Sequence, residues 1–372
     1  MNILLKNAKV FTPDHPALEA NVRVTGERIS EVGRGLASRE GEQVLDLAGF
    51  RLYPGFINAH VHAAFFTDEV FREFVRNGCT TLRDMAMMVE GDEAAVIGRM
   101  SSFRQDPGMP RMVFCGKFIC TPSSYGSLHP DGRRHVSVEV STPQEAEEVV
   151  NRYADLGCRG VKTALDDGSL LGLKNSLPPD EFFEAIFSAA KSRGLFVSAH
   201  ITRSGNLEHF LEMGDEEVAH IPIDEMPKAL IQMLKDRDLC VCTTLTMYEM
   251  LEKTTGQKLL EIALKNAGIL SRAGVRLAVG NDMMEDNGFF EHGIPVREMQ
   301  LLAEAGLPVN EIIRDATYEA ARTCWIDDET GSIEAGKSAD LIAVRGEPDK
   351  TFSCFNDIPL VINRGSLIVD RI

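Results

Sequence analysis

Residues 51–64, RLYPGFINAHVHAA, combine an apolar run with two histidines one residue apart. The run from Leu52 to Ile57 predicts a buried strand, and His60 and His62 stand at its end. Side chains at i and i+2 of an extended backbone point the same way, so both imidazoles can reach one point beyond the strand. That geometry suits a metal ion, but paired histidines are also common as ordinary strand residues. The rest of the chain must therefore supply matching ligands.

Composition bounds the classes of protein that this chain can form. It has 372 residues, 44% of them hydrophobic, and a net charge of −17, which disfavours a nucleic-acid or anionic-membrane partner. The first residues, MNILLKNAKVF, lack the apolar core of a signal peptide, and no apolar stretch is long enough to span a bilayer. Eight cysteines without a C-x-x-C pair predict free thiols. We expect a cytoplasmic protein.

The pattern of apolar and polar residues changes twice along the chain. Residues 1–53 and 325–372 contain short strand patterns separated by turns, and both segments are predicted to build one small β domain. Between them, residues 54–324 alternate apolar runs with helical patterns, which is typical of βα units and a parallel sheet. Thr142, Pro143 and Glu145 predict the start of one such helix through an N-cap, a first-turn proline and a capping box.

Eight βα units can be counted, which predicts a closed (β/α)8 TIM barrel of the α/β class. Catalytic groups of such barrels lie at the carboxyl ends of the strands. Here those ends carry metal-capable side chains, whose clustering beside a core would be costly without coordination. The predicted strands are LYPGFIN, CTTLRDM, RMVFCG, RGVKTAL, LFVSAHI, EEVAHIP, LCVCTTL and VRLAVGND, and the residues at their ends are His60, His62, Lys162, His200, His220 and Asp282.

These motifs resemble the amidohydrolase superfamily of metal-dependent hydrolases. The resemblance rests on PGFINAHVH, GCTTLRDM, GVKTAL, FVSAHI, EEVAHIP, AVGNDM and GSIEAGKSADLIAV, and so covers nearly the whole chain. The runs GCTTLRDM, MGDEEVAHIP and TTLTMYE are most similar to the subgroup of imidazolonepropionases and Xaa-Pro dipeptidases. The resemblance implies that the small domain is a β-sandwich and that the partner is a small-molecule substrate. A homo-oligomer is compatible with it.

The resemblance also implies a binuclear metal centre. His60, His62 and Asp282 would hold the more buried of two divalent metals, and His200 with His220 the more exposed one. Zinc suits this ligand set, with manganese, iron and cobalt as alternatives. Lys162 would bridge the metals as an N6-carboxylated side chain, because a buried amine can become neutral and add carbon dioxide. The alternative for Lys162 is a pair with a carboxylate inside the barrel.

The implied reaction is hydrolysis of an amide in a dipeptide, an N-acyl amino acid or a cyclic amide. A metal-bridging hydroxide would be the nucleophile, and Asp282 would act as general base and then general acid. Ester or lactone hydrolysis uses the same chemistry. A mononuclear deaminase would keep a glutamate three residues after the strand-five histidine, where this chain has Arg203. A non-catalytic assembly protein is a third alternative, disfavoured because all six positions are intact.

Several further residues are candidates for substrate contacts or for support of the site. His129, Arg203, Tyr248 and His292 follow strands three, five, seven and eight, respectively, so each could contact a substrate, although surface exposure competes as an explanation. Arg83 and Asp84 are expected to form an ion pair that braces the barrel. Asn58 and Asn281 depart from the residues that the family has most often, and we expect altered hydrogen bonding around the metals without loss of a ligand.

Overall fold

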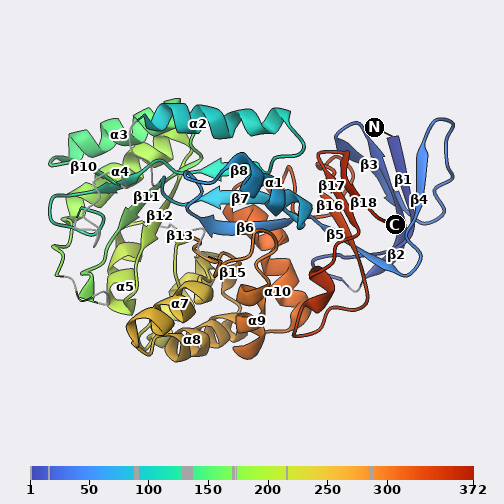
Figure 1. Ribbon diagram of the computed structural model, residues 1–372. Helices are drawn as coiled ribbons and strands as arrows, with labels where there is room; N and C mark the ends of the chain where they lie inside the picture. Colours follow the sequence, from blue (N-terminus) through green and yellow to red (C-terminus); the bar gives the residue numbers. More distant parts are fainter. Residues whose placement is uncertain are drawn as a thin grey trace.

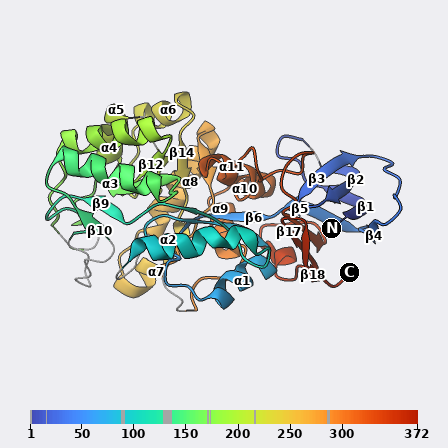
Figure 2. The same cartoon turned by 90° about the horizontal axis from the view of Figure 1, so that it is seen from above.

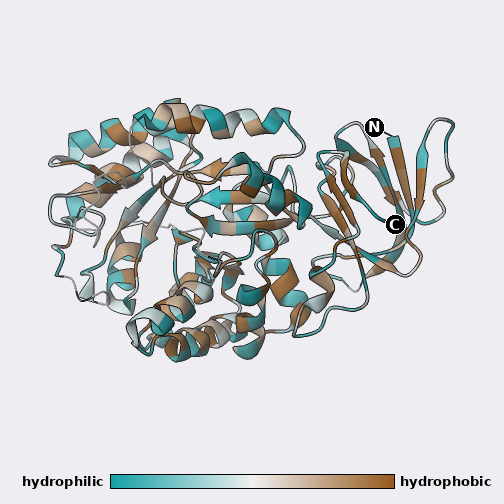
Figure 3. Cartoon of the chain, in the orientation of Figure 1, coloured by the Kyte–Doolittle hydropathy of each residue, from teal (hydrophilic) through white to brown (hydrophobic). Residues whose placement is uncertain are grey.

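The computed structural model describes residues 2–15, 17–87, 92–127, 137–169, 172, 174–214, 217–284 and 288–372. A β sheet built from both chain ends lies at one end of the molecule, and parallel strands covered by helices form the larger remainder (Figures 1 and 2). The N- and C-termini both lie on the terminal sheet (Figure 1). Apolar residues concentrate on the strands, as the hydropathy colouring in Figure 3 shows.

The terminal sheet has eight strands in the order β18-β17-β16-β5-β1-β2-β3, with β4 paired to β1. The two chain ends meet where β5 and β16 pair in antiparallel register. A sandwich of two sheets is not confirmed, because hydrogen bonding joins all eight strands into one sheet. The strands are β1 (Asn2–Val10), β2 (Leu18–Thr25), β3 (Arg28–Gly33), β4 (Gln43–Asp46), β5 (Phe50–Pro54), β16 (Leu341–Arg345), β17 (Leu360–Asn363) and β18 (Ser366–Asp370).

The predicted first strand of the barrel is divided at Gly55. The residues before it form β5 in the terminal sheet, and those after it form β6 in the parallel part. A Cβ at Gly55 would lie 2.1 Å from the hydroxyl oxygen of Thr80, so only glycine fits where the chain passes from one sheet to the other. The apolar run 52–57 gave no sign of this division, because both halves are buried.

Eight parallel strands follow one another in the predicted order. They form a three-stranded sheet, β6-β7-β8, and a five-stranded sheet, β11-β12-β13-β14-β15. Between the two sheets the described residues form isolated bridges, Cys115 to Gly160 and Val61 to Met283, and single backbone hydrogen bonds such as Ala59 to Val279, but no continuous ladder. One continuous closed barrel is therefore not formed, although the α/β class is as predicted. The strands are β6 (Phe56–Val61), β7 (Cys79–Asp84), β8 (Arg111–Phe114), β11 (Gly160–Ala164), β12 (Phe196–His200), β13 (Glu217–Val218), β14 (Cys240–Cys242) and β15 (Arg276–Ala278).

Helices connect these strands and pack against them. A short two-stranded parallel sheet, β9 (Phe118–Cys120) and β10 (Ser137–Glu139), lies between β8 and α3. The helices are α1 (Asp68–Arg76), α2 (Glu93–Ser102), α3 (Pro143–Asp155), α4 (Asp180–Arg193), α5 (Ser204–Met213), α6 (Lys228–Asp236), α7 (Leu245–Thr255), α8 (Leu260–Ala273), α9 (Val296–Glu304), α10 (Val309–Asp315) and α11 (Tyr318–Thr323). Among the described residues no helix has the length and apolarity to cross a membrane. All eight cysteines are free thiols.

The capping box at the start of α3 is confirmed. The Thr142 hydroxyl accepts a hydrogen bond from the Glu145 amide, and the Glu145 carboxylate accepts one from the Thr142 amide. Replacing Thr142 with alanine is expected to lower the free energy of unfolding by about 1 kcal/mol, because the helix loses an N-terminal partner. Chemical denaturation measures the effect. Thr142→Ser keeps the hydroxyl and should unfold like the wild type; equal loss in both variants would contradict the cap's contribution.

The expected ion pair between Arg83 and Asp84 is wrong. The side chains of neighbouring strand residues point to opposite faces of the sheet. Arg83 instead forms a bidentate ion pair with Glu217 of β13. Asp84 accepts hydrogen bonds from the amides of Ala63 and Ala86. Arg83 still braces the interior, because its guanidinium links β7 to β13 across the parallel strands.

Candidate metal centre

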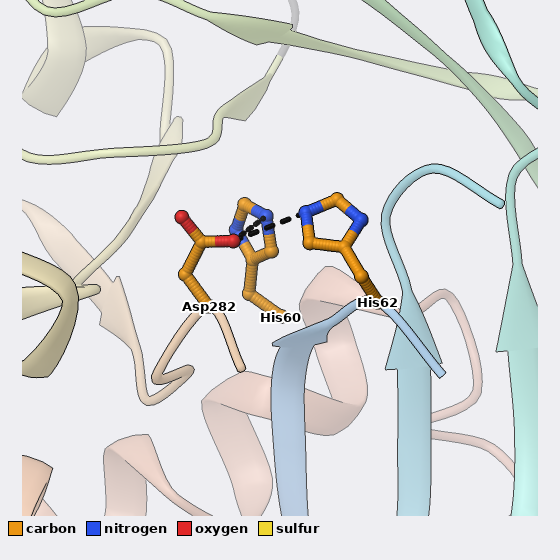
Figure 4. A group of neighbouring side chains, drawn as sticks. All are labelled: His60, His62 and Asp282. Atoms are coloured by element: carbon orange, nitrogen blue, oxygen red, sulfur yellow. Dashed lines mark ion pairs between the residues drawn. The ribbon is translucent and has the colours of Figure 1, made fainter. Parts of the chain in front are cut away.

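His60, His62 and Asp282 meet where β6 ends and the chain leaves β15. The Nε2 atoms of His60 and His62 lie 3.3 and 3.1 Å from Oδ1 of Asp282, and one ligand atom from each residue falls within 4.8 Å of the others. Figure 4 shows the two imidazoles and the carboxylate directed toward one point. All three side chains are buried. Two histidine nitrogens and a carboxylate oxygen form a common donor set for a divalent metal.

Backbone carbonyls fix the orientation of both imidazoles. The Nδ1 atom of His60 lies 3.2 Å from the carbonyl oxygen of Ala219, and that of His62 lies 2.8 Å from the carbonyl oxygen of Ala86. A carbonyl can only accept, so both rings carry their proton on Nδ1. The lone pairs on Nε2 are thereby directed at Asp282, as second partners of metal-binding histidines commonly arrange.

His200 and His220 form a second group of donors beside the first. The Nδ1 atom of His200 and the Nε2 atom of His220 face each other at 2.9 Å, and the far nitrogen of His220 lies 3.0 Å from the Thr244 hydroxyl. Two nitrogens bound to one zinc ion lie about 3.3 Å apart, so a small movement would let both face a single cation. The rings of His60 and His220 lie 5.0 Å apart, which joins the two groups.

Lys162 is fully buried on β11, and its Nζ atom has no hydrogen-bond partner among the described residues. Burial lowers the pKa of Lys162 to about 8, although the Asp282 carboxylate acts in the opposite direction. An unpaired amine in a protein interior is costly. The alternative in which Lys162 pairs with a carboxylate is thus not seen in the described part of the chain.

The histidines are held mostly as neutral ligands. Burial lowers the pKa of His60 and of His220 well below the usual value, and the charge of Lys162 adds to both effects. Burial likewise lowers the pKa of His200 to about 4. Burial also acts to lower the pKa of His62, but the neighbouring Asp282 carboxylate outweighs it and the pKa is raised. Neutral imidazoles are the form that binds metals.

The backbone around Asp282 is adapted to bring its carboxylate against β6. Asp282 itself has a positive φ of 53°, and a Cβ at Gly280 would lie 2.6 Å from the amide nitrogen of His60. Asn58 donates to the side-chain oxygen of Asn281 at 2.8 Å and accepts from the amides of His60 and Asn281. The two asparagines that depart from the family pattern therefore bond to each other and join the sheets beside the ligands.

Two residues that the sequence did not single out border the site. The ring of Tyr125 stacks on His200 with 4.1 Å between centroids, and burial raises the pKa of its hydroxyl. Asp166, two residues beyond the end of β11, accepts hydrogen bonds from the amide and hydroxyl of Thr202 and lies 3.9 Å from Nε2 of His200. Asp166 could have been found by the strand-end rule, whereas Tyr125 follows the unpredicted strand β9.

The remaining candidates for substrate contact are placed differently. Tyr248 is buried on α7, with its hydroxyl donating to the carbonyl of Ile221, and Arg203 lies just before α5, 3.5 Å from the Ser169 hydroxyl. His292 instead lies 2.7 Å from the carboxylate of Glu73 on helix α1. His129, together with the loop 128–136, lies outside the described residues.

Parallel strands whose carboxyl ends gather histidines, a buried lysine and an aspartate define a class of α/β proteins with a candidate metal site at the strand ends. Within that class the chain belongs to the amidohydrolase family, whose pattern it matches over residues 51–365. Among curated proteins it is 24% identical to a 5-methylthioadenosine/S-adenosylhomocysteine deaminase of Moorella thermoacetica, over 92% of this chain and 85% of that one. It is 23% identical to an imidazolonepropionase of Symbiobacterium thermophilum, over 92% and 86%.

Solved structures share the fold over the full length of the chain. A prolidase in complex with N-methylphosphonate-L-proline has a TM-score of 0.86 at 20% identity, covering 100% of both chains. A Xaa-Pro dipeptidase with methionine in its active site has a TM-score of 0.82 at 22% identity, covering 99% of both. At these identities the likeness concerns the fold. The family match over residues 51–365 makes the chain a hydrolase of the amidohydrolase superfamily.

Proposed function

We propose that this protein is a binuclear, zinc-dependent hydrolase that cleaves amide bonds in dipeptides, N-acyl amino acids or cyclic amides. The observation that carries the proposal is the fully buried Nζ atom of Lys162, without a partner in the described structure, beside converging histidine nitrogens and a carboxylate. Carboxylation of this amine would give it two oxygens that can bind metal ions, which would offset the cost of its burial. The ligands in this proposal are His60, His62, Lys162, His200, His220 and Asp282.

The protein's own groups have separable tasks in this proposal. Bound divalent metals would supply Lewis acidity, which polarises a carbonyl and brings the pKa of water toward neutrality. Asp282 accepts the proton of the attacking water with one carboxylate oxygen and delivers it to the departing amine. The hydrogen bond from its amide to the carbonyl of His60, at 2.9 Å, holds it against β6. Tyr125 and Arg203 border the site and are the candidates for orienting the substrate.

The relatives include both amide hydrolases and deaminases, and two features of this chain's own sequence favour amide hydrolysis. Two structural relatives act as prolidase and dipeptidase by their names, whereas two curated relatives are deaminases. In this chain the third residue after His200 is Arg203, which cannot donate a proton as a glutamic acid can. The buried Lys162 also favours two metals over one. Deamination of a heterocycle and hydrolysis of an ester or lactone are the alternative reactions.

A substrate screen with zinc-loaded protein tests the proposal. Dipeptides, N-acyl amino acids, cyclic amides, lactones and aminopurines are incubated with the protein, and free amine, acid and ammonia are measured separately. Turnover of an amide is expected, with loss of essentially all activity after dialysis against a chelator and recovery on zinc addition, because a metal ion supplies the Lewis acidity. Release of ammonia from aminopurines alone, or activity that survives the chelator with no bound metal, would contradict it.

A further inference from the structure

Glu298 of α9 is a fully buried carboxylate that binds the first turn of α7. Its Oε1 atom accepts a hydrogen bond from the Leu245 amide at 2.8 Å, and its Oε2 atom accepts from the amide and hydroxyl of Thr246 at 2.7 and 2.6 Å. In the described part of the chain this carboxylate forms no ion pair, and its further hydrogen-bonding neighbour is the side chain of Thr243. Burying an acid here is unfavourable unless its oxygens are satisfied, and three donors from α7 satisfy them.

The residue before that turn, Thr244, lies against the metal centre. Thr244 has a positive φ of 47°, a conformation that a β-branched residue seldom adopts, and its side chain does not cap the helix. Its hydroxyl instead lies 3.0 Å from Nδ1 of His220, while its amide donates to the carbonyl of Gly280 at 2.9 Å. The strained backbone therefore turns the hydroxyl away from α7 and toward His220.

A hydroxyl at this place decides how His220 can bind a metal. When it accepts from Nδ1–H of the imidazole, the lone pair is left on Nε2, the nitrogen that faces His200. The Thr244 hydroxyl stays beside Nδ1 of His220 only if helix α7 begins at Leu245, directly after Thr244. α7 lacks a side-chain cap from its own N-cap residue, and Glu298 supplies that cap from another helix.

We propose that Glu298 is a positioning residue of the metal centre, which fixes the start of α7 so that Thr244 orients His220 for the more exposed metal. This inference rests on the proposed function. Glu298 is 52 and 53 residues from the amides that it binds. The contacts form a chain from Glu298 through the α7 amides and Thr244 to His220.

Zinc binding to the full-length protein tests the inference with a readout other than activity. The Glu298→Gln variant keeps the size of the side chain but presents an amide group to donors that need an acceptor. Competition with a chromogenic chelator should show the weaker zinc site, which we assign to His200 and His220 because it is the more exposed, loosened about 10- to 100-fold, with the tighter site unchanged. The visible spectrum of the cobalt-loaded variant should change in the component from the weaker site. Thr246→Val, which removes only the hydroxyl donor, should give a smaller loss in the same site.

Controls separate positioning from a general loss of stability. Glu319→Gln removes an equally buried carboxylate that pairs with Arg276 and Arg314 instead, and should leave both zinc affinities unchanged. Thr244→Val should reproduce the Glu298→Gln defect, whereas Thr244→Ser, with its hydroxyl kept, should restore the binding. Wild-type zinc affinities in Glu298→Gln, or in Thr246→Val if the former does not fold, would overturn this inference but leave the proposed function standing. Failure of the wild type to bind zinc would overturn the proposed function.

Discussion

Replacing Lys162 with methionine is expected to remove one of the two proposed metals and to lower kcat/KM by about 10³-fold or more. Methionine fills a similar volume, so the packing around the fully buried side chain should change little. What is lost is the amine that can take up carbon dioxide and bridge the two groups of histidines. The remaining metal would keep His60, His62 and Asp282, while His200 and His220 would lack an anionic partner.

Elemental analysis of purified wild type and Lys162→Met gives the metal content per chain, and steady-state kinetics with the best screened amide gives the activity. Carbon-13 NMR of protein equilibrated with labelled bicarbonate should show a carbamate signal in the wild type that is missing in the variant. Lys162→Ala should lose metal in the same way. Two metals per chain together with full activity in Lys162→Met would refute the bridging role of this residue.

The metal candidates could be predicted because each follows a short apolar run. His60, His62, His200 and His220 all end strands of the predicted order, and parallel strands bring their carboxyl ends together whatever the loops between them do. The rule needs only the positions of strands in the sequence. It also applies to Asp166, which directly follows the predicted strand RGVKTAL.

Contacts between distant segments could not be predicted in the same way. Their adjacency favours an ion pair between Arg83 and Asp84, but the partner of Arg83 is Glu217, 134 residues away, and no local sequence pattern links these two residues. Tyr125 became a site residue only through its stacking on His200 in space. The sequence also concealed the division at Gly55, since burial in either sheet selects the same apolar residues. The hydrophobic periodicity of a sequence predicts strands and helices, but it does not predict which distant side chains will contact each other.

The Asp282→Asn variant is expected to lower kcat by about 10³- to 10⁴-fold, more than it raises KM, because an amide cannot carry the proton from water to the leaving amine. Asparagine retains the shape of the side chain and one oxygen toward His60 and His62. The variant should therefore keep most of its bound metal. A large fall in kcat with near-complete metal content distinguishes proton transfer from simple loss of a ligand.

Steady-state kinetics, metal analysis and circular dichroism are measured together on this variant. Asp315→Asn is a matched control, because Asp315 is also buried and its charged neighbours include Glu319, Arg314, Glu311 and Arg276, none of which is a proposed metal ligand. It should keep wild-type kcat, which assigns the effect to the position of Asp282 and not to the removal of a buried acid. If Asp282→Asn with full metal content turned over amides at the wild-type rate, another group would have to move the proton. Asp166, 3.9 Å from His200, would then be the next carboxylate to replace.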